Sequence, residues 1–349
     1  MQSTKEKRGY TGLANLGNTC FLNACLQVMS HTYELAKLLD SQKCKKLIKP
    51  DSPDSTILNE WSDLRKIMWS NNGVVSPNKF VHTVQQISRL KNKDIFTGFA
   101  QNDMSEFLLF FMDCLHNSIS RPIHMKINGT IENATDQIAV KSYEMLKTVY
   151  EREYSELMDM MYGIYVTNIR HITEDKIHSI HPEHFSILDL QLFNEHTAFT
   201  TIEECFDHFT IEEILQGDNA WFNDATQTKE TVKKNVSFWS LPQILVITLK
   251  RFLPDGQHKI NNLVQFPIEN LDLNKYIIGY NKSSYLYDLY GVCNHMGGVH
   301  GGHYTAFVKN QDNVWIHYND TSVEIVNDPL QIITPMAYCL FYRKKNKVL

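Results

Sequence analysis

The chain contains 349 residues, with 34 Lys and Arg against 39 Asp and Glu, so its formal net charge is −5. This balance gives no overall basic field, which argues against nucleic acid or anionic lipid as a general partner. Hydrophobic residues make up 43% and charged residues 21%, with 10 Pro and 15 Gly, and these values exclude a disordered or fibrous chain.

The N-terminal residues, the lack of a long apolar stretch and the cysteines together predict an intracellular protein. Residues 1–8 are polar with no apolar run behind them, and no stretch reaches the ~18 consecutive apolar residues of a membrane span. An odd number of widely spaced cysteines is typical of reduced thiols rather than a disulfide framework. The seven are Cys20, Cys25, Cys44, Cys114, Cys205, Cys293 and Cys339. We therefore expect a monomer of the cytoplasm, the nucleus or both, without contact to membrane or nucleic acid.

The first third of the chain is predicted to be mainly helical. After Cys20, the apolar residues Leu22, Cys25, Leu26 and Met29 recur at helical spacing, and residues 105–115 carry a second apolar stripe. Thr19 or Asn18 is placed to cap the first helix. Core packing is the expected role of both stripes.

Residues 123–161 are polar and rich in Lys and Glu, which predicts further helix. Beyond them, β-branched and aromatic segments bounded by turn-forming residues predict strands. These segments are 164–170, 185–193, 232–238, 244–249, 286–292, 304–309, 314–318 and 338–342. Because no linker or repeat separates the halves, we predict a single α+β domain with a mostly antiparallel sheet in its second half.

Cys20 is the cysteine best placed to act as a nucleophile. It follows a loop that contains Gly12 and Gly17 and opens an amphipathic helix, where unpaired N–H groups favour a thiolate. Of the other cysteines, Cys25 and Cys114 lie on apolar helix faces, and Cys44 falls in a basic stretch expected at the surface. Most buried cysteines are small core residues, so position alone is weak support for catalysis.

His303 is the natural partner for such a thiol. It lies between two glycine pairs and a predicted strand, where a substrate backbone could approach closely and the strand would fix the ring. A third group commonly orients the imidazole. A short hairpin through residues 311–313 would bring Asn319 or Asp320 beside His303, and either could serve.

Four segments resemble the sequence boxes of the ubiquitin-specific proteases, a papain-like family of deubiquitinating enzymes. Residues 12–23 read GLANLGNTCFLN, residues 101–108 read QNDMSEFL, residues 249–252 read LKRF, and residues 301–306 read GGHYTA, followed by YND at 318–320. The boxes occur in family order between residues 9 and 343. The resemblance implies a papain-like α+β fold with a helical thumb (about 9–160), extended β fingers (about 161–240) and a β-rich palm (about 241–343), flanked by short tails at 1–8 and 344–349.

The resemblance also implies catalytic roles. Cys20 would attack the carbonyl of ubiquitin's C-terminal glycine, with His303 as base and then acid. Asn319 matches the position that orients the histidine, with Asp320 as the fallback. Asn15 matches the side chain that stabilises the oxyanion. Together they imply a thiol hydrolase that cleaves ubiquitin from proteins or from ubiquitin chains through an acyl-enzyme, with no cofactor.

Recognition of ubiquitin's arginine-containing tail is implied for a further set of residues. Asp103 and Glu106 match acidic positions expected to pair with the tail arginines. Their spacing equally fits a helix N-cap and its capping-box partner. His295 and residues 297–302 would form a mobile loop that flanks the tail channel. The expected tail-binding residues are Gln101, Asp103, Glu106, His295, Gly301, Gly302 and Tyr304.

The chain departs from the family at the zinc site of the fingers. Family members hold this zinc with two Cys-x-x-Cys pairs. The corresponding positions fall near His171 and Glu174 and near Asn223 and Thr226, none of which is a cysteine. We therefore predict no structural zinc, and fingers held by strand pairing and hydrophobic packing. Asn102, in place of a second Gln, is a smaller departure.

Two alternative functions stay open at this point. The chain could be a non-catalytic ubiquitin-binding module whose triad is misaligned, although an idle site has no physical need for Asn15, Cys20, His303 and Asn319 together. It could also act on a ubiquitin-like modifier with a similar tail. The acidic residues Asp103 and Glu106 favour an arginine-bearing tail but do not distinguish between such modifiers.

Overall fold

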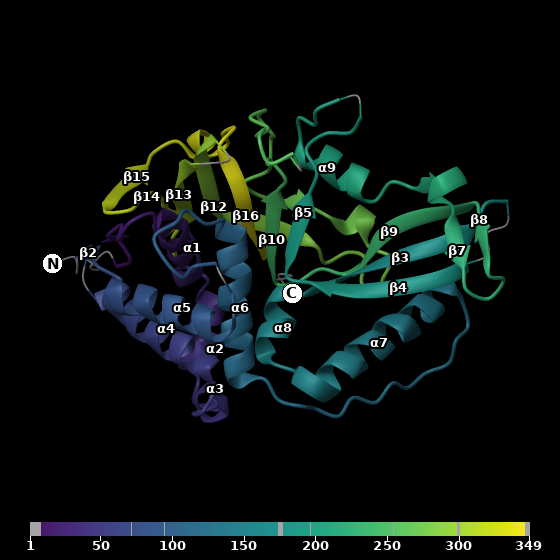
Figure 1. Ribbon diagram of the computed structural model, residues 1–349, viewed down its shortest axis with the longest axis horizontal. Helices are drawn as coiled ribbons and strands as arrows, with labels where there is room; N and C mark the ends of the chain where they lie inside the picture. Colours follow the sequence, from purple (N-terminus) through teal and green to yellow (C-terminus); the bar gives the residue numbers. More distant parts are fainter. Residues whose placement is uncertain are drawn as a thin grey trace.

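Figure 1 shows the computed structural model of the chain. The structure describes residues 8–70, 72–93, 95–173, 177–195, 197–253, 255–298 and 301–345. A helical part packs against one face of a large sheet, and a ribbon of long strands extends from the other end of that sheet (Figure 1). The α+β class predicted from the sequence is thus confirmed.

The helical part is built around one buried helix, α1 (Cys20–Ser30), which contacts α6 on one side and the sheet on the other. All eleven residues of α1 are buried, so the single apolar face predicted for it understates its burial. The polar residues Asn23 and Gln27 are accommodated because their amides donate to backbone carbonyls of residues 11–14. The surrounding helices are α2 (Tyr33–Asp40), α3 (Gln42–Leu47), α4 (Pro53–Ser70), α5 (Asn78–Leu90) and α6 (Met104–Ile119), and a parallel pair joins β1 (Thr11–Leu13) to β2 (Gly73–Val75).

The predicted helix over 123–161 is wrong at its start. Residues 122–133 have no helical structure, and the helices are α7 (Ala134–Glu153) and α8 (Glu156–Met161). Asn133 stops the helix from extending backward, because it adopts an extended conformation and forms a reciprocal capping box with Asp136. The polar composition of the segment indicated exposure correctly but carried no signal for this boundary.

The large sheet holds most of the predicted strands. Its order is β15-β14-β13-β12-β16-β10-β5, with β11 paired to β12, and every pair is antiparallel except β10 with β5. Its strands are β5 (Ile187–Leu190), β10 (Ile244–Leu249), β11 (Leu271–Asp272), β12 (Leu286–Gly298), β13 (Gly301–Lys309), β14 (Trp315–Asn319), β15 (Ser322–Val326) and β16 (Ala337–Lys344). One face packs on α1, and the other covers a second core that includes Phe206 of α9 (Ile202–Phe209). The sheet thereby fixes β13 directly against α1.

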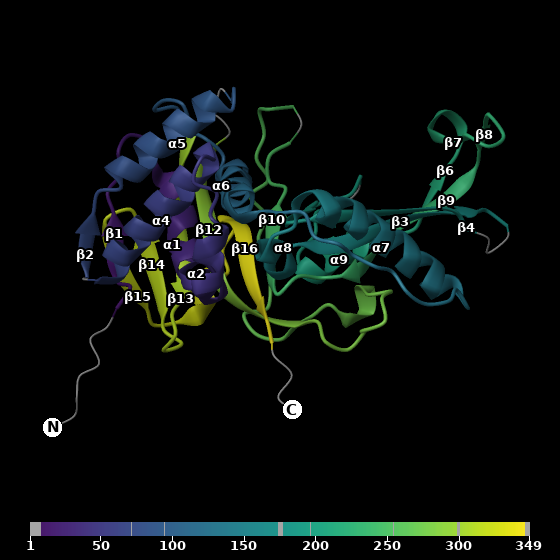
Figure 2. The ribbon, with the colours of Figure 1, turned by 90° about the horizontal axis from the view of Figure 1, so that it is seen from below.

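A four-stranded ribbon of order β4-β3-β9-β6 extends away from the helical part, with α7 along it and the β7–β8 hairpin at its tip (Figures 1 and 2). Its strands are β3 (Gly163–His171), β4 (Ile177–Phe185), β6 (Glu213–Leu215) and β9 (Val232–Ser240), and the hairpin is β7 (Trp221–Asn223) with β8 (Thr228–Glu230). The strand predicted over 185–193 is confirmed only over Ile187–Leu190, which is β5 of the large sheet, because Phe185 is the last residue of β4. Strand β4 lacked the alternating apolar pattern because most of its residues keep some exposure on both faces.

All seven cysteines are free thiols and all are buried. The expectation that Cys44 lies at the surface is therefore wrong. Helix α3 turns Cys44 inward, where it is 1% exposed, while its neighbours Lys43 and Lys45 face solvent. Among the described residues, no helix is both long and apolar enough to span a membrane.

Candidate active site

Cys20 is the first residue of α1, at the point where the loop from β1 enters the helical core. That loop turns sharply, with positive φ angles at Gly17 (98°) and Asn18 (56°). Thr19 occupies the N-cap position but does not cap the helix with its side chain, contrary to the expectation for Thr19 or Asn18. Its hydroxyl accepts from the Leu16 N–H instead and so stabilises the turn. The first N–H groups of α1, near the thiol, therefore have no side-chain cap.

Cys20 is 4% exposed, and burial raises the pKa of its thiol above the ordinary value. The Tyr304 backbone N–H and the first N–H groups of α1 act in the opposite direction, whereas the negative charge of Asp320 raises the pKa further. Tyr304 follows His303 in β13. The N–H groups of β13 and of the start of α1 therefore favour the thiolate, against the effect of burial.

Alkylation of Cys20 by iodoacetamide in the free protein is expected to be slow at neutral pH and to rise through an inflection at higher pH than that of an ordinary thiol. The reason is that only the thiolate reacts, and burial disfavours the thiolate. Mass spectrometry of the Cys20 peptide at several pH values measures the rate, with urea-unfolded protein as the control that restores the ordinary inflection. An inflection below the unfolded value would contradict the expected dominance of burial.

His303 and Asn319 are brought together by the β13–β14 hairpin. The register pairs Ala306 with Tyr318, and His303 Nε2 lies 2.7 Å from Asn319 Oδ1. Since the amide oxygen can only accept, Nε2 carries the proton of this bond in the neutral ring, which leaves Nδ1 as the basic nitrogen. The predicted hairpin is confirmed, and Asn319 rather than Asp320 is the residue that contacts the imidazole.

Asp320 instead ties the cysteine loop to the end of β14. Its Oδ2 accepts from Asn15 Nδ2 at 2.9 Å, its Oδ1 accepts from Asn23 Nδ2 at 2.8 Å, and its backbone carbonyl accepts from the Leu13 N–H. The close approach requires glycine at position 12, because a Cβ atom there would lie 2.5 Å from the carbonyl oxygen of Thr321. Sequence reasoning missed the role of Asn23, although this residue belongs to the same box.

The orientation of the Asn15 amide is fixed from both sides. Its oxygen accepts from the N–H groups of Gly17 and Thr19, while one hydrogen of its NH₂ group is used by Asp320. An amide nitrogen carries two hydrogens, so the second remains available for a ligand beside the exposed side chain. This is the arrangement expected of a preorganised donor.

Asp103 is fully engaged within the protein. It is the N-cap of α6, as predicted, but Glu106 does not form the predicted reciprocal capping-box bond to it. The second carboxylate oxygen of Asp103 accepts from Tyr304 and Tyr338. The pairing of Asp103 with an arginine of the ubiquitin tail stays a prediction. The Glu106 side chain is exposed. Burial of part of it, and then the negative charge of Asp103, raise the pKa of its carboxyl.

The residues expected in a mobile loop are arranged differently. His295 is a strand residue of β12 and is 4% exposed, so its assignment to a loop is wrong. Burial is the main cause that lowers the pKa of His295 to about 4, and the positive charge of Lys259 is the second. The His295 ring is therefore neutral near His303. Gly301 and Gly302 pair with β12, while residues 299 and 300 at the tip lie outside the described residues.

Gln101 reaches across to the same strand. Its amide oxygen accepts from the Gly302 N–H at 2.7 Å, and its amide nitrogen donates to the Gly302 carbonyl at 3.2 Å. A Cβ atom at Gly302 would lie 2.2 Å from His295 Nε2, so this position requires glycine. Gly302 is therefore held between Gln101 on one side and β12 on the other.

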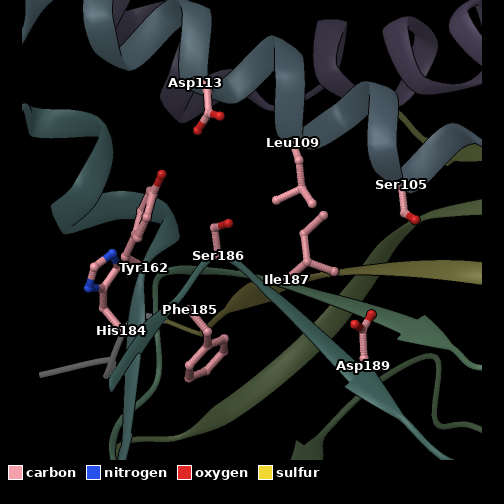
Figure 3. Close-up of a pocket in the computed structure, with 9 residues that line it drawn as sticks. All are labelled: Ser105, Leu109, Asp113, Tyr162, His184, Phe185, Ser186, Ile187 and Asp189. Atoms are coloured by element: carbon pink, nitrogen blue, oxygen red, sulfur yellow. The ribbon is translucent and has the colours of Figure 1, made fainter. Parts of the chain in front are cut away.

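A groove of about 360 Å³ runs between α6 and β5, close to this network. Figure 3 shows Ser105, Leu109 and Asp113 along the helix, facing Ile187 and Asp189 on the strand. The far end is lined by Tyr162, His184, Phe185 and Ser186. Partial burial raises the pKa of Asp113 and of Asp189. A cationic ligand in the groove would favour their charged forms.

Arg251, in the LKRF segment, supports the loop beside the site. It is fully buried, and its guanidinium donates to the carbonyl oxygens of Ala337, Ile260 and Asn262. Burial lowers its pKa to about 10. No sequence pattern indicated this role, because a buried arginine bound only to carbonyls has no paired acidic residue to reveal it.

At the tip of the ribbon, the positions aligned with zinc ligands carry other interactions. Asn223 and Thr226 both donate to Glu230 Oε1 at 2.8 Å, and the His171 ring packs 5.5 Å from that of His178. Glu174 lies outside the described residues. Within the described ranges, His, Cys, Asp and Glu form no group of three that could hold a metal ion. The absence of zinc stays a prediction.

Comparisons with known proteins show similarity in both sequence and fold. A family model described as ubiquitin carboxyl-terminal hydrolase matches residues 11–342. Ubiquitin carboxyl-terminal hydrolase 2 of Bos taurus is 32% identical over 97% of the chain, which spans about half (56%) of that relative. Ubiquitin carboxyl-terminal hydrolase 2 of Gallus gallus is 31% identical, and the match covers 98% of this chain and 95% of that relative.

Among solved structures, the fold matches the SAGA Ubp8/Sgf11/Sus1/Sgf73 DUB module bound to ubiquitin aldehyde. The TM-score is 0.74 at 22% identity, with 99% of this chain and 71% of that chain covered. At this identity the likeness concerns the fold, and the papain-like α+β fold implied by the sequence boxes is confirmed.

Proposed function

Because the chain belongs to the ubiquitin carboxyl-terminal hydrolase family, whose model matches residues 11–342, we propose that it is a cysteine-dependent deubiquitinase. It hydrolyses the peptide or isopeptide bond after ubiquitin's C-terminal glycine, on ubiquitinated proteins or ubiquitin chains. The observation that carries the proposal is the contact of His303 in β13 with Asn319 in β14, beside Tyr304, whose backbone N–H lowers the pKa of the Cys20 thiol.

Acylation begins with the thiol, because burial keeps Cys20 protonated. His303 Nδ1 takes the proton from Cys20 while Sγ forms a bond to the glycine carbonyl carbon. When the tetrahedral intermediate collapses, the C–N bond breaks and the departing amine receives that proton from the imidazolium. Water then attacks the thioester and gives one proton to His303, which passes it to the Cys20 sulfur as the C–S bond breaks. The glycine carboxylic acid loses its proton to solvent and leaves as the carboxylate.

The second hydrogen of the Asn15 amide and the N–H groups at the start of α1 stabilise the oxyanion. Asn15 suits this task because its orientation is set before substrate arrives, so little reorganisation is needed during the reaction. Asn319 keeps the imidazole in the tautomer with a basic Nδ1.

The groove between α6 and β5 is the proposed path of the approaching ubiquitin tail. Its carboxylates Asp113 and Asp189 and the exposed Glu106 provide negative charge for arginine side chains. Asp103 contributes through the protein network instead of through direct pairing. The matched SAGA module is bound to ubiquitin aldehyde, which supports the same class of partner here.

Hydrolysis of a fluorogenic ubiquitin C-terminal amide tests the proposal. We expect turnover by the wild type and a loss of roughly 10⁶-fold with Cys20→Ala, because the nucleophile is removed. Cys44→Ala, a second buried thiol on α3, is the matched control and should retain turnover. Equal rates for wild type and Cys20→Ala would reject the proposal, and calorimetric binding of ubiquitin without turnover would favour a binding module. Parallel assays on ubiquitin-like modifiers define the substrate class.

A further inference from the structure

Residues 101–103 hold the chain on both sides of His303. Gln101 makes two hydrogen bonds to the backbone of Gly302, the residue before His303. Asp103 accepts from the side chain of Tyr304, the residue after it. One short segment at the start of α6 thus brackets the imidazole at its two neighbours, and none of these bonds involves a ligand.

The two oxygens of Asp103 divide their bonds between the two sides of the site. Oδ1 accepts from the Ser105 and Glu106 N–H groups and from the Ser105 hydroxyl, and so caps α6. Oδ2 accepts from Tyr304 at 3.2 Å and from Tyr338 at 2.5 Å, and so binds β13 and β16. A single carboxylate therefore joins the helix to the sheet that carries His303.

Tyr304 transmits this connection to the nucleophile. Its ring is buried beside His295 and Tyr338, with centroid distances of 4.6 and 5.9 Å. Its backbone N–H acts on the Cys20 thiol and lowers the pKa of that thiol, against the effect of burial. A shift of the Tyr304 side chain would move both this donor and the adjacent imidazole.

We propose that Gln101 and Asp103 are positioning residues that set His303 and the Tyr304 N–H against Cys20, acting through Gly302 and Tyr304. The proposal rests on the proposed deubiquitinase function but assigns these residues a role different from direct recognition of the ubiquitin tail. Bonds to a charged carboxylate are stronger than neutral ones, so the Tyr304 bond to Asp103 is expected to matter more than the two Gln101 bonds.

Removal of the tyrosine hydroxyls separates positioning from tail recognition, because the two roles predict different results. If Asp103 positions the site, Tyr304→Phe lowers kcat roughly tenfold with little change in KM, since a bond that aligns the reacting groups is lost. If Asp103 awaits a tail arginine, the same change frees its carboxylate, so KM falls or stays constant and kcat is unchanged.

Tyr338→Phe and Tyr342→Phe complete the kinetic series. Tyr338 donates to the same Asp103 oxygen, so its loss should lower kcat in the same direction. Tyr342 lies in the same strand, but its hydroxyl donates to the Pro267 carbonyl on the far side of the sheet. It controls for the loss of a buried hydroxyl and should leave kcat unchanged. An unchanged kcat in Tyr304→Phe would overturn the proposal.

Alkylation of Cys20 by iodoacetamide provides a readout that needs no ubiquitin. Tyr304→Phe, Asp103→Asn and Gln101→Glu should each slow it severalfold, because the Tyr304 N–H that favours the thiolate is displaced. In Asp103→Asn, the new side chain can still cap α6. In Gln101→Glu, one carboxylate oxygen still accepts from the Gly302 N–H, while the other lies against the Gly302 carbonyl oxygen and repels it. Wild-type rates in all three variants would overturn the proposal. If the wild type fails to hydrolyse ubiquitin amide, the proposed function fails, but this comparison still decides the positioning role.

Discussion

His303→Ala is expected to lower kcat for the fluorogenic ubiquitin amide by roughly 10⁶-fold, about as much as Cys20→Ala, because nucleophile and base act as a unit. Without the imidazole, a thiol whose pKa is raised by burial has no group to accept its proton. The Cys20→Ala and His303→Ala double variant should lose no more than either single variant. Single-turnover measurements with each protein provide the comparison.

The Asn319 variants refine the same prediction. Asn319→Ala removes the oxygen that lies 2.7 Å from His303 Nε2 but leaves the base in place, so we expect a smaller loss, roughly 10²-fold or more. Asn319→Asp keeps an acceptor at this position and should retain most of the activity. A His303→Ala variant that lost less than Asn319→Ala would contradict the assignment of His303 as base.

The reactive residues were predictable because each carries its own local signal. Cys20 combines a glycine-containing loop with a helix start, and His303 combines glycine pairs with a strand start. The short β13–β14 hairpin fixes the distance between His303 and Asn319 with few degrees of freedom. These local signals made the residues candidates, and the resemblance to the family's sequence boxes selected them, including Asn319 over Asp320.

The partners of Asp103 and Asp320 were not predictable in the same way. Asp103 meets Tyr338, which is 235 positions away, and Asp320 meets Asn15, which is 305 positions away. Such pairs depend on how the sheet docks on α1, which no local pattern encodes. From the sequence, Asp103 beside the active site suggested a contact with substrate. In the folded chain, the sheet that docks on α1 brings hydrogen-bond donors such as Tyr338 to this carboxylate.

Burial was misjudged for a related reason. Cys44 lies among lysines and His295 among glycines, so composition indicated surface for the first and a loop for the second. In the folded chain one side of α3 faces the core, and β12 continues through His295 to Gly298. Average composition over a window cannot reveal which single side chain points inward.

Asp320→Ala is expected to lower kcat by roughly 10²- to 10³-fold, as much as Asn15→Ala, because the oxyanion donor loses the acceptor that orients it. Loss of the bond to Asn23 would loosen the same loop. The two substitutions should be strongly non-additive, since both remove one preorganised donor, so the double variant should resemble either single variant. Measured kcat values for the four proteins complete the cycle.

The thiol itself should respond to Asp320→Ala in the opposite direction. The charge of Asp320 raises the pKa of Cys20, so its removal should leave alkylation by iodoacetamide equal or faster while hydrolysis falls. A general collapse of the site would instead be expected to perturb both reactions together. If Asp320 oriented His303, the double variant Asp320→Ala with Asn319→Ala would lose no more kcat than either single variant. The double variant Asp320→Ala with Asn15→Ala would then show the product of the two single losses. The contacts at Oδ1 and Oδ2 predict the reverse, because they join Asp320 to the cysteine loop and leave the imidazole to Asn319.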